Sequence, residues 1–215
     1  MELQTQKINP GLMRYVETEI IPLYDEFDKA HQREHVRMVI CQSLELAARL
    51  GADLDMAYAV AAFHDTGLCE GRERHHLVSA SIIRSDRELP RWFSDEQIEV
   101  MAEAAEDHRA SAERPPRSLY GRIVAEADRF IDPLTVIRRT IQFGNDHYPE
   151  LSREEHFLRT MAHLREKYGR GGYLHLWFPD SPNARRLEQL RQMIDQEEPV
   201  RQVFEREFGG TLTIS

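Results

Sequence analysis

Two features are nearly absent from the sequence: cysteine and long apolar runs. The 215 residues include only Cys41 and Cys69, too few for a disulfide framework. The longest apolar run, residues 56–63, is far shorter than the ~18 residues that indicate a membrane-spanning helix. The N-terminus also lacks the basic and apolar segments of an export signal. We therefore expect a cytoplasmic protein without a membrane attachment.

Positive charge is also in short supply. The chain has 28 Lys and Arg against 37 Asp and Glu, which gives a formal net charge of −9. Because nucleic-acid binding draws on a basic surface that neutralises phosphates, we expect no stable nucleic-acid complex. Long runs of alternating β-branched residues are missing as well, whereas apolar residues recur at helical spacing almost throughout. The sequence therefore predicts an all-α protein.

Capping residues and helix breakers divide this pattern into separate helices. Residues 54–63 are apolar nearly all round, so the helix that Asp53 caps is expected to be central. Ser94 with Gln97, and Ser152 with Glu155, match the capping box that opens a helix. Other helices are expected over residues 11–29, 34–50 with Gly51 as the stop, and 75–89 with Pro90 as the stop, from Ser118 through 130, and from Pro182 to about Gly209-Gly210.

No internal repeat or linker divides the chain, so we expect a single domain over residues 1–215. It would comprise a helical core at about 31–132 and a helical extension at about 145–210 that packs on this core. Three aromatic residues beside Gly171-Gly172 are expected to anchor the last helix rather than to cover a site: Tyr173, Trp177 and Phe178.

The doublet His64-Asp65 is the first candidate for chemistry, because it ends the most apolar helix of the chain. Burying a charged carboxylate there costs several kcal/mol unless the group is paired or coordinated. A metal ion would offset this cost, and the break at Thr66-Gly67 allows both side chains to turn toward one ion. Taken alone, the doublet is equally well explained by Asp65 capping the next turn.

Three separated segments together resemble the HD-domain metal-dependent phosphohydrolases. They are His35 in Glu-His-Val-Arg-Met-Val, His64-Asp65 in Ala-Ala-Phe-His-Asp-Thr-Gly, and Asp128 in Ala-Glu-Ala-Asp-Arg-Phe. The chain looks closest to the small stand-alone bacterial members, which share its His-Arg-Ala-Ser, Tyr-Gly-Arg-Ile and Ala-Asp-Arg runs. The Gly-Tyr-Pro signature of the members that act on cyclic dinucleotides is missing. The resemblance covers about residues 31–132 and implies a helical bundle of the HD type.

This resemblance also implies the site residues. His35, His64, Asp65 and Asp128 would bind one divalent metal ion, and His75 and His108 would hold a second ion or reach the phosphate. The spacing to Ser79-Ala80 favours His75 over its neighbour His76. A purely structural role remains an alternative for both of these histidines. The remaining histidines are expected to be structural or exposed side chains: His31, His147, His156, His163 and His175.

The chemistry of these side chains fits hydrolysis. Imidazole and carboxylate ligands suit Mn²⁺, Fe²⁺, Zn²⁺, Ni²⁺, Co²⁺ or Mg²⁺ and require no thiolate. Asp65 is the candidate that orients the attacking water, and His75 or His108 would protonate the leaving oxygen or balance phosphoryl charge. Arg109 and Arg122 are candidate phosphate clamps, or they simply pair with the surplus of acidic residues.

We therefore expect a metal-dependent phosphohydrolase acting on a small phosphorylated metabolite, with nucleotides as the first choice. Two alternatives stay open on the sequence alone. One is a dinuclear iron oxygenase, since HD-type folds with two irons oxidise substrates. The other is a non-catalytic module that senses a nucleotide through its metal. The sequence leaves the substrate, the metal and the oligomeric state open.

Overall fold

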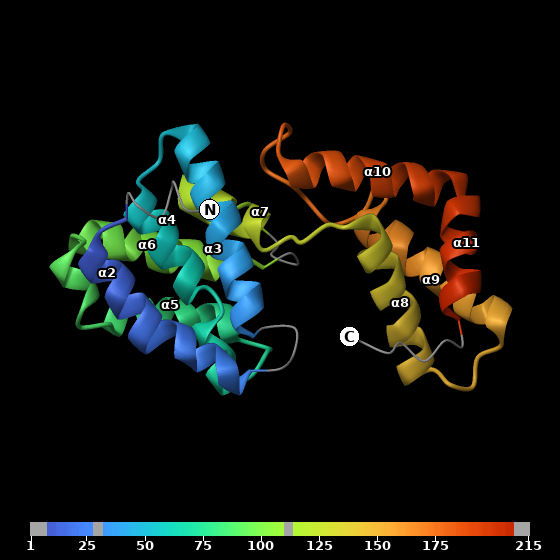
Figure 1. Ribbon diagram of the computed structural model, residues 1–215, viewed down its shortest axis with the longest axis horizontal. Helices are drawn as coiled ribbons and strands as arrows, with labels where there is room; N and C mark the ends of the chain where they lie inside the picture. The colour runs from blue at the N-terminus through green and yellow to red at the C-terminus, as the bar shows by residue number, and fades with distance from the viewer. Residues whose placement is uncertain (1–7, 28–31, 110–113, 209–215) are drawn as a thin grey trace. The chain divides into compact units, whose positions relative to one another are not determined.

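The computed structural model describes residues 8–27, 32–109 and 114–208. Every element in these ranges is a helix, which confirms the all-α prediction (Figure 1). The helices form two compact units, Met1–Arg129 and Phe130–Ser215. The single-domain organisation expected from the sequence stays a prediction. Within the described ranges, no helix has both the length and the apolar character needed to cross a bilayer.

The first unit is built around α4 (Leu54–Phe63), as its composition predicts. Every residue from Met56 to Phe63 is buried, and none is more than 5% exposed. Asp53 accepts a hydrogen bond from the Met56 amide at 3.1 Å and so caps the helix. Helix α4 packs against the α-helices α3 (Arg33–Leu50), α6 (Asp95–Asp107) and α7 (Leu119–Ala127).

The N-terminal segment is helical but not the single α-helix expected over residues 11–29. It consists of α2 (Pro10–Tyr15), the π-helical turn η1 (Val16–Ile20) and the 3₁₀ helix η2 (Ile21–Glu26). Pro22 explains the change, because it has no amide hydrogen and its ring crowds the carbonyl one turn earlier. The backbone therefore widens before the proline and tightens after it. The expected end at residue 29 lies outside the described residues.

Two further helices of this unit end earlier than expected. Helix α5 (His75–Ser85) stops before Asp86, whose side chain accepts hydrogen bonds from the amides of Glu88 and Leu89. These bonds start the short 3₁₀ helix η5 (Leu89–Arg91) instead of continuing α5. Helix α7 begins after Ser118 as predicted but ends at Ala127 rather than 130, so Asp128 stands at its C-terminal cap.

The second unit packs four helices around its own apolar core. Its first helix, α8 (Pro133–His147), was missed from the sequence although Asp132 caps it and Pro133 opens it. Helix α9 (Arg153–Tyr168) begins with the predicted capping box of Ser152 and Glu155. The core includes Phe157 and Phe204, which pack edge to face with ring centres 5.3 Å apart.

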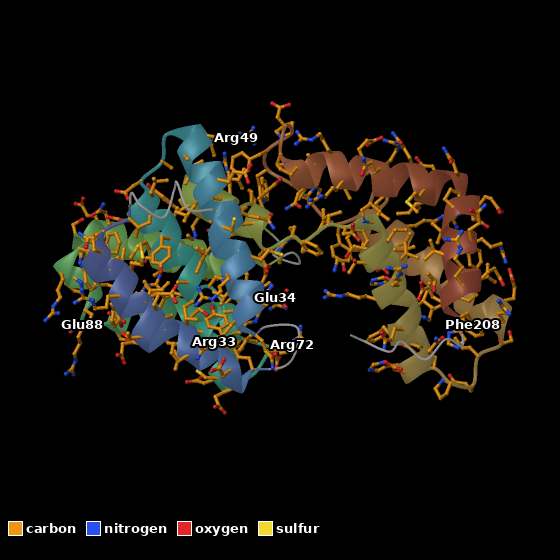
Figure 2. All side chains as sticks on the ribbon, viewed as in Figure 1. Arg33, Glu34, Arg49, Arg72, Glu88 and Phe208 are labelled. Atoms are coloured by element: carbon orange, nitrogen blue, oxygen red, sulfur yellow. The ribbon has the colours of Figure 1, made fainter. Side chains whose placement is uncertain are left out.

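The C-terminal helix expected from Pro182 is two helices, α10 (Pro182–Gln196) and α11 (Glu198–Glu207). Glu197 separates them with a left-handed backbone, φ 60°. Pro199 accounts for the break, because a proline inside a continuous helix would clash with the carbonyl of Asp195. Phe208, labelled in Figure 2, follows α11, and the expected stop at Gly209-Gly210 lies outside the described residues.

Candidate metal centre

The first set of candidate ligands lies where α3 begins and where α4 and α7 end. His35 lies in the first turn of α3, which begins at Arg33 and Glu34 in Figure 2. Its Nε2 is 3.3 Å from Asp128 Oδ1 and 3.6 Å from Asp65 Oδ2. His64, the cap of α4, has Nε2 at 3.2 Å from Asp65 Oδ2 and 3.8 Å from Asp128 Oδ1. The fold therefore gathers the four residues that the sequence analysis proposed for the first ion.

A second set shares Asp65 with the first. His75 opens α5 and His108 caps α6, and each Nε2 lies 3.4 Å from Asp65 Oδ1. The two Nε2 atoms are 3.2 Å apart. The two oxygens of Asp65 thus face different histidine groups, His35 and His64 on one side and His75 and His108 on the other. Asp65 forms one group of three with His35 and His64, and another with His75 and His108. In each group, one ligand atom from every residue lies within 4.8 Å of the other two.

Backbone carbonyls fix which nitrogen of three rings carries the proton. Nδ1 of His64 is 2.8 Å from the Ala61 carbonyl, Nδ1 of His75 is 2.7 Å from the Arg72 carbonyl, and Nδ1 of His108 is 2.6 Å from the Ala105 carbonyl. Because a carbonyl oxygen only accepts, each Nδ1 must donate. Each neutral ring therefore presents the lone pair of Nε2 to the centre, the state in which histidine binds metal.

In this tautomer, the lone pairs of neighbouring acceptor atoms point toward one another. The Nε2 atoms of His75 and His108 face each other and also face Asp65 Oδ1. His64 Nε2 is buried and makes no hydrogen bond within the described residues. Acceptors packed this closely in a buried site repel one another unless a proton or a cation lies among them. A divalent ion satisfies all of them at once, so the donor set fits a borderline ion such as Zn²⁺, Fe²⁺, Mn²⁺ or Ni²⁺.

The centre concentrates negative charge in a place that water hardly reaches. Asp65 is 3% exposed and His64 is fully buried. Burial raises the pKa of Asp65, but the surrounding histidines outweigh it and hold that pKa well below its usual range. Burial lowers the pKa of His35, whereas the carboxylates of Asp128 and Asp65 raise it to about 9. Without an ion, the carboxylates therefore draw onto His35 a proton that an ion would displace.

The C-terminal end of α4 is held by side chains that satisfy its last carbonyl groups. Tyr24 of η2 donates its hydroxyl hydrogen to the Ala62 carbonyl at 2.9 Å, and its oxygen accepts from the Asp65 amide at 3.4 Å. Thr66 donates to the Phe63 carbonyl at 2.8 Å. Since the carbonyl groups at a helix end need partners, these bonds fix the backbone that carries the His64-Asp65 doublet.

Gly67 brings the doublet and α5 into direct backbone contact. It lies in the 3₁₀ helix η4 (Thr66–Glu70), and its amide donates to Ser79 Oγ at 2.9 Å. A Cβ at this position would lie 2.1 Å from the His75 carbonyl oxygen and 2.5 Å from the Ser79 amide nitrogen. Only glycine fits this approach, which places His75 against Asp65.

The structure treats the other proposed residues differently. Arg109 donates to the Glu73 carbonyl at 3.1 Å. Burial lowers the pKa of both His75 and His76, and the nearby charge of Arg109 lowers it further. Arg109 therefore lies at the rim of the second set. Arg122 is exposed on α7 and is not among the described residues that contact either set. His76 meets the His75 ring edge to face, with ring centres 5.6 Å apart, but belongs to neither ligand group.

Sequence reasoning missed Arg129 at this centre. Its side chain is only 10% exposed, and its Nη1 donates to Asp128 Oδ2 at 2.9 Å. The quoted run Ala-Asp-Arg contains this residue, yet neighbouring residues of a helix point about 100° apart and are not expected to touch. The end of α7 at Ala127 removes that restriction.

A helical bundle whose helix ends collect histidine and carboxylate ligands defines a protein with a candidate metal centre. Residues 33–131 match the family model of the HD domain. This segment is therefore an HD domain, as the resemblance predicted, and all residues of both sets lie inside it. No curated protein and no solved structure matches the chain.

Proposed function

We propose that this protein is a metal-dependent phosphohydrolase that cleaves a phosphoester or phosphoanhydride bond of a small metabolite, with nucleotides as the leading substrate class. The observation that carries the proposal is the shared carboxylate of Asp65, which faces two groups of histidine nitrogens through its two oxygens. Two ions held by these residues would supply positive charge for a displacement at phosphorus. An HD domain with this donor arrangement suits that reaction.

The proposal gives each residue a role. His35, His64, Asp65 and Asp128 would hold the first ion, and Asp65, His75 and His108 would hold the second or assist the phosphoryl group. A bound divalent ion lowers the pKa of its water from 15.7 toward ~7 and so supplies a nucleophile at neutral pH. Asp65 would orient this water, since its carboxylate lies between both sets.

The proton and charge requirements of the reaction fall on the second set. His75 or His108, when not occupied by an ion, would protonate the leaving oxygen. Arg109 donates to the Glu73 carbonyl, two residues before His75, and would pair with phosphate oxygens that project from this set. Arg122 has no supporting contact, so we do not carry it forward as a phosphate clamp.

The test combines metal analysis with turnover. Protein purified without added metal is analysed for its elements and then assayed against a phosphoester panel with Mn²⁺, Mg²⁺, Ni²⁺ and Co²⁺. We expect His64→Ala and Asp65→Ala to lose both metal and hydrolysis while the circular dichroism of helices persists. His175→Ala, an exposed histidine outside the centre, is the matched control and should change neither.

The outcome of this test separates the rival functions. Phosphate release at the wild-type rate by the His64→Ala and Asp65→Ala double variant would refute the site. Full metal occupancy without turnover of any phosphoester, together with a nucleotide-dependent rise in melting temperature, would indicate a sensor. An absorption band that appears after aerobic iron loading would indicate an oxygenase.

A further inference from the structure

Arg129 lies outside both candidate ion sets and contacts one member of each. Its Nη1 donates to Asp128 Oδ2 at 2.9 Å, and its Nη2 donates to the His108 carbonyl at 2.7 Å. Asp128 belongs to the first set and His108 to the second. The guanidinium therefore joins the C-terminal ends of α6 and α7, each of which delivers one ligand.

The hydrogen bond from Arg129 gives the two oxygens of the Asp128 carboxylate different partners. Oδ2 accepts from Arg129, whereas Oδ1 faces His35 Nε2 at 3.3 Å and His64 Nε2 at 3.8 Å. Oδ2 is thus turned toward the guanidinium, and Oδ1 is the oxygen that faces the first ion position. Hydrogen bonds of this kind fix the orientation of a carboxylate ligand, and losing one typically weakens metal binding about 10–100-fold.

The bond to His108 gives the guanidinium a second effect. The two Nη atoms of an arginine are part of one rigid plane, so their two acceptors are held at a fixed separation. Here one acceptor is the Asp128 carboxylate and the other is the backbone of His108. Lysine has a single nitrogen on a flexible stem and cannot hold both acceptors in this way.

We infer that Arg129 is a positioning residue that makes Asp128 a one-oxygen ligand and fixes the spacing between the two ion positions. This inference rests on the proposed function. It assigns Arg129 no contact with substrate. Its positive charge also offsets part of the negative charge that Asp65 and Asp128 bring to the centre.

The experiment titrates chelator-treated protein with Mn²⁺ and follows stoichiometry by calorimetry and spin coupling by electron paramagnetic resonance. Wild-type protein should bind two ions whose spectra show exchange coupling through the shared carboxylate of Asp65. In Arg129→Lys, the affinity for Mn²⁺ should fall about 10–100-fold, the usual cost of losing an outer-shell partner, and the coupling should change. Arg49→Lys, an exposed arginine in the last turn of α3, is the matched control and should behave as wild type.

A double-mutant cycle distinguishes positioning from damage to the fold. If Arg129 acts through Asp128, its substitution should weaken Mn²⁺ binding much less in an Asp128→Ala background than in wild type. The same loss in both backgrounds would overturn the inference, as would unchanged affinity and coupling in Arg129→Lys. A wild type that binds two ions but ignores Arg129 refutes this inference alone. A wild type that binds a single ion refutes the spacing role, and one that binds no metal refutes the proposed function as well.

Discussion

Gly67→Ala is the substitution whose effect follows most directly from the geometry. The added Cβ would meet the His75 carbonyl oxygen at 2.1 Å, whereas ordinary contacts begin at 3.4 Å. The 3₁₀ turn and α5 must therefore separate by about 1.3 Å, and no side-chain rotation relieves the clash, because the two nearest atoms belong to the backbone. Overpacking of this kind costs about 3 kcal/mol, the upper end of its usual range.

The assay is thermal unfolding together with Mn²⁺ binding. For a chain of this size, about 3 kcal/mol lowers the melting temperature by about 6–12 °C. His75 should also move away from Asp65, so the second ion should bind at least about 10-fold more weakly. Gly171→Ala is the control, since a Cβ there meets nothing within 4 Å and no positive φ is required. If Gly67→Ala melts and binds Mn²⁺ like wild type, the close approach of η4 to α5 is wrong.

Three further predictions concern the charges and caps of the two units. Ser152→Ala removes the capping box of α9 and should lower the free energy of unfolding by about 1 kcal/mol in denaturant titrations, with metal content unchanged. Asp107→Asn weakens three hydrogen bonds from Arg117 to a buried carboxylate and should cost about 2 kcal/mol by the same measurement; a stability equal to wild type would contradict this network. For His35, burial lowers the pKa but the adjacent carboxylates raise it to about 9, above the ordinary 6.5. The protonated ring therefore stabilises metal-free protein below pH 6.5, and this contribution is lost as the pH rises to about 9. Melting temperatures of chelator-treated protein across this window should fall, more so than those of His35→Gln, and a parallel fall in both would count against the prediction.

Most of the fold could be predicted because its signals are local. The capping boxes at Ser94 and Ser152, the cap at Asp53 and the left-handed Gly51 all stand where the sequence indicated. The errors came where a single residue redirects the backbone. Pro22 alters the N-terminal helix, and Pro199 divides the C-terminal one, although the apolar spacing continues across both.

The sequence indicated which residues belong to the candidate site, but not which of their atoms face one another. The order of histidines and aspartates along the chain, through the family resemblance, pointed to the residues that the fold gathers. Neither spacing nor composition could show that Asp65 divides its oxygens between two sets, because this depends on how α5 and α6 pack on α4. For the same reason the sequence did not point to Arg129, whose contact with the His108 carbonyl spans 21 positions of the chain.

Five different helices of the first unit bring the ligand atoms together, and no fragment of this unit contains a finished centre. His35 comes from the start of α3 and Asp128 follows α7, so nearly the whole unit must dock before an ion finds its ligands. We therefore expect metal to bind only after these helices have packed together. An ion present at a concentration of 100 times its dissociation constant would then raise the free energy of unfolding by about 2.7 kcal/mol, because it binds only the folded bundle.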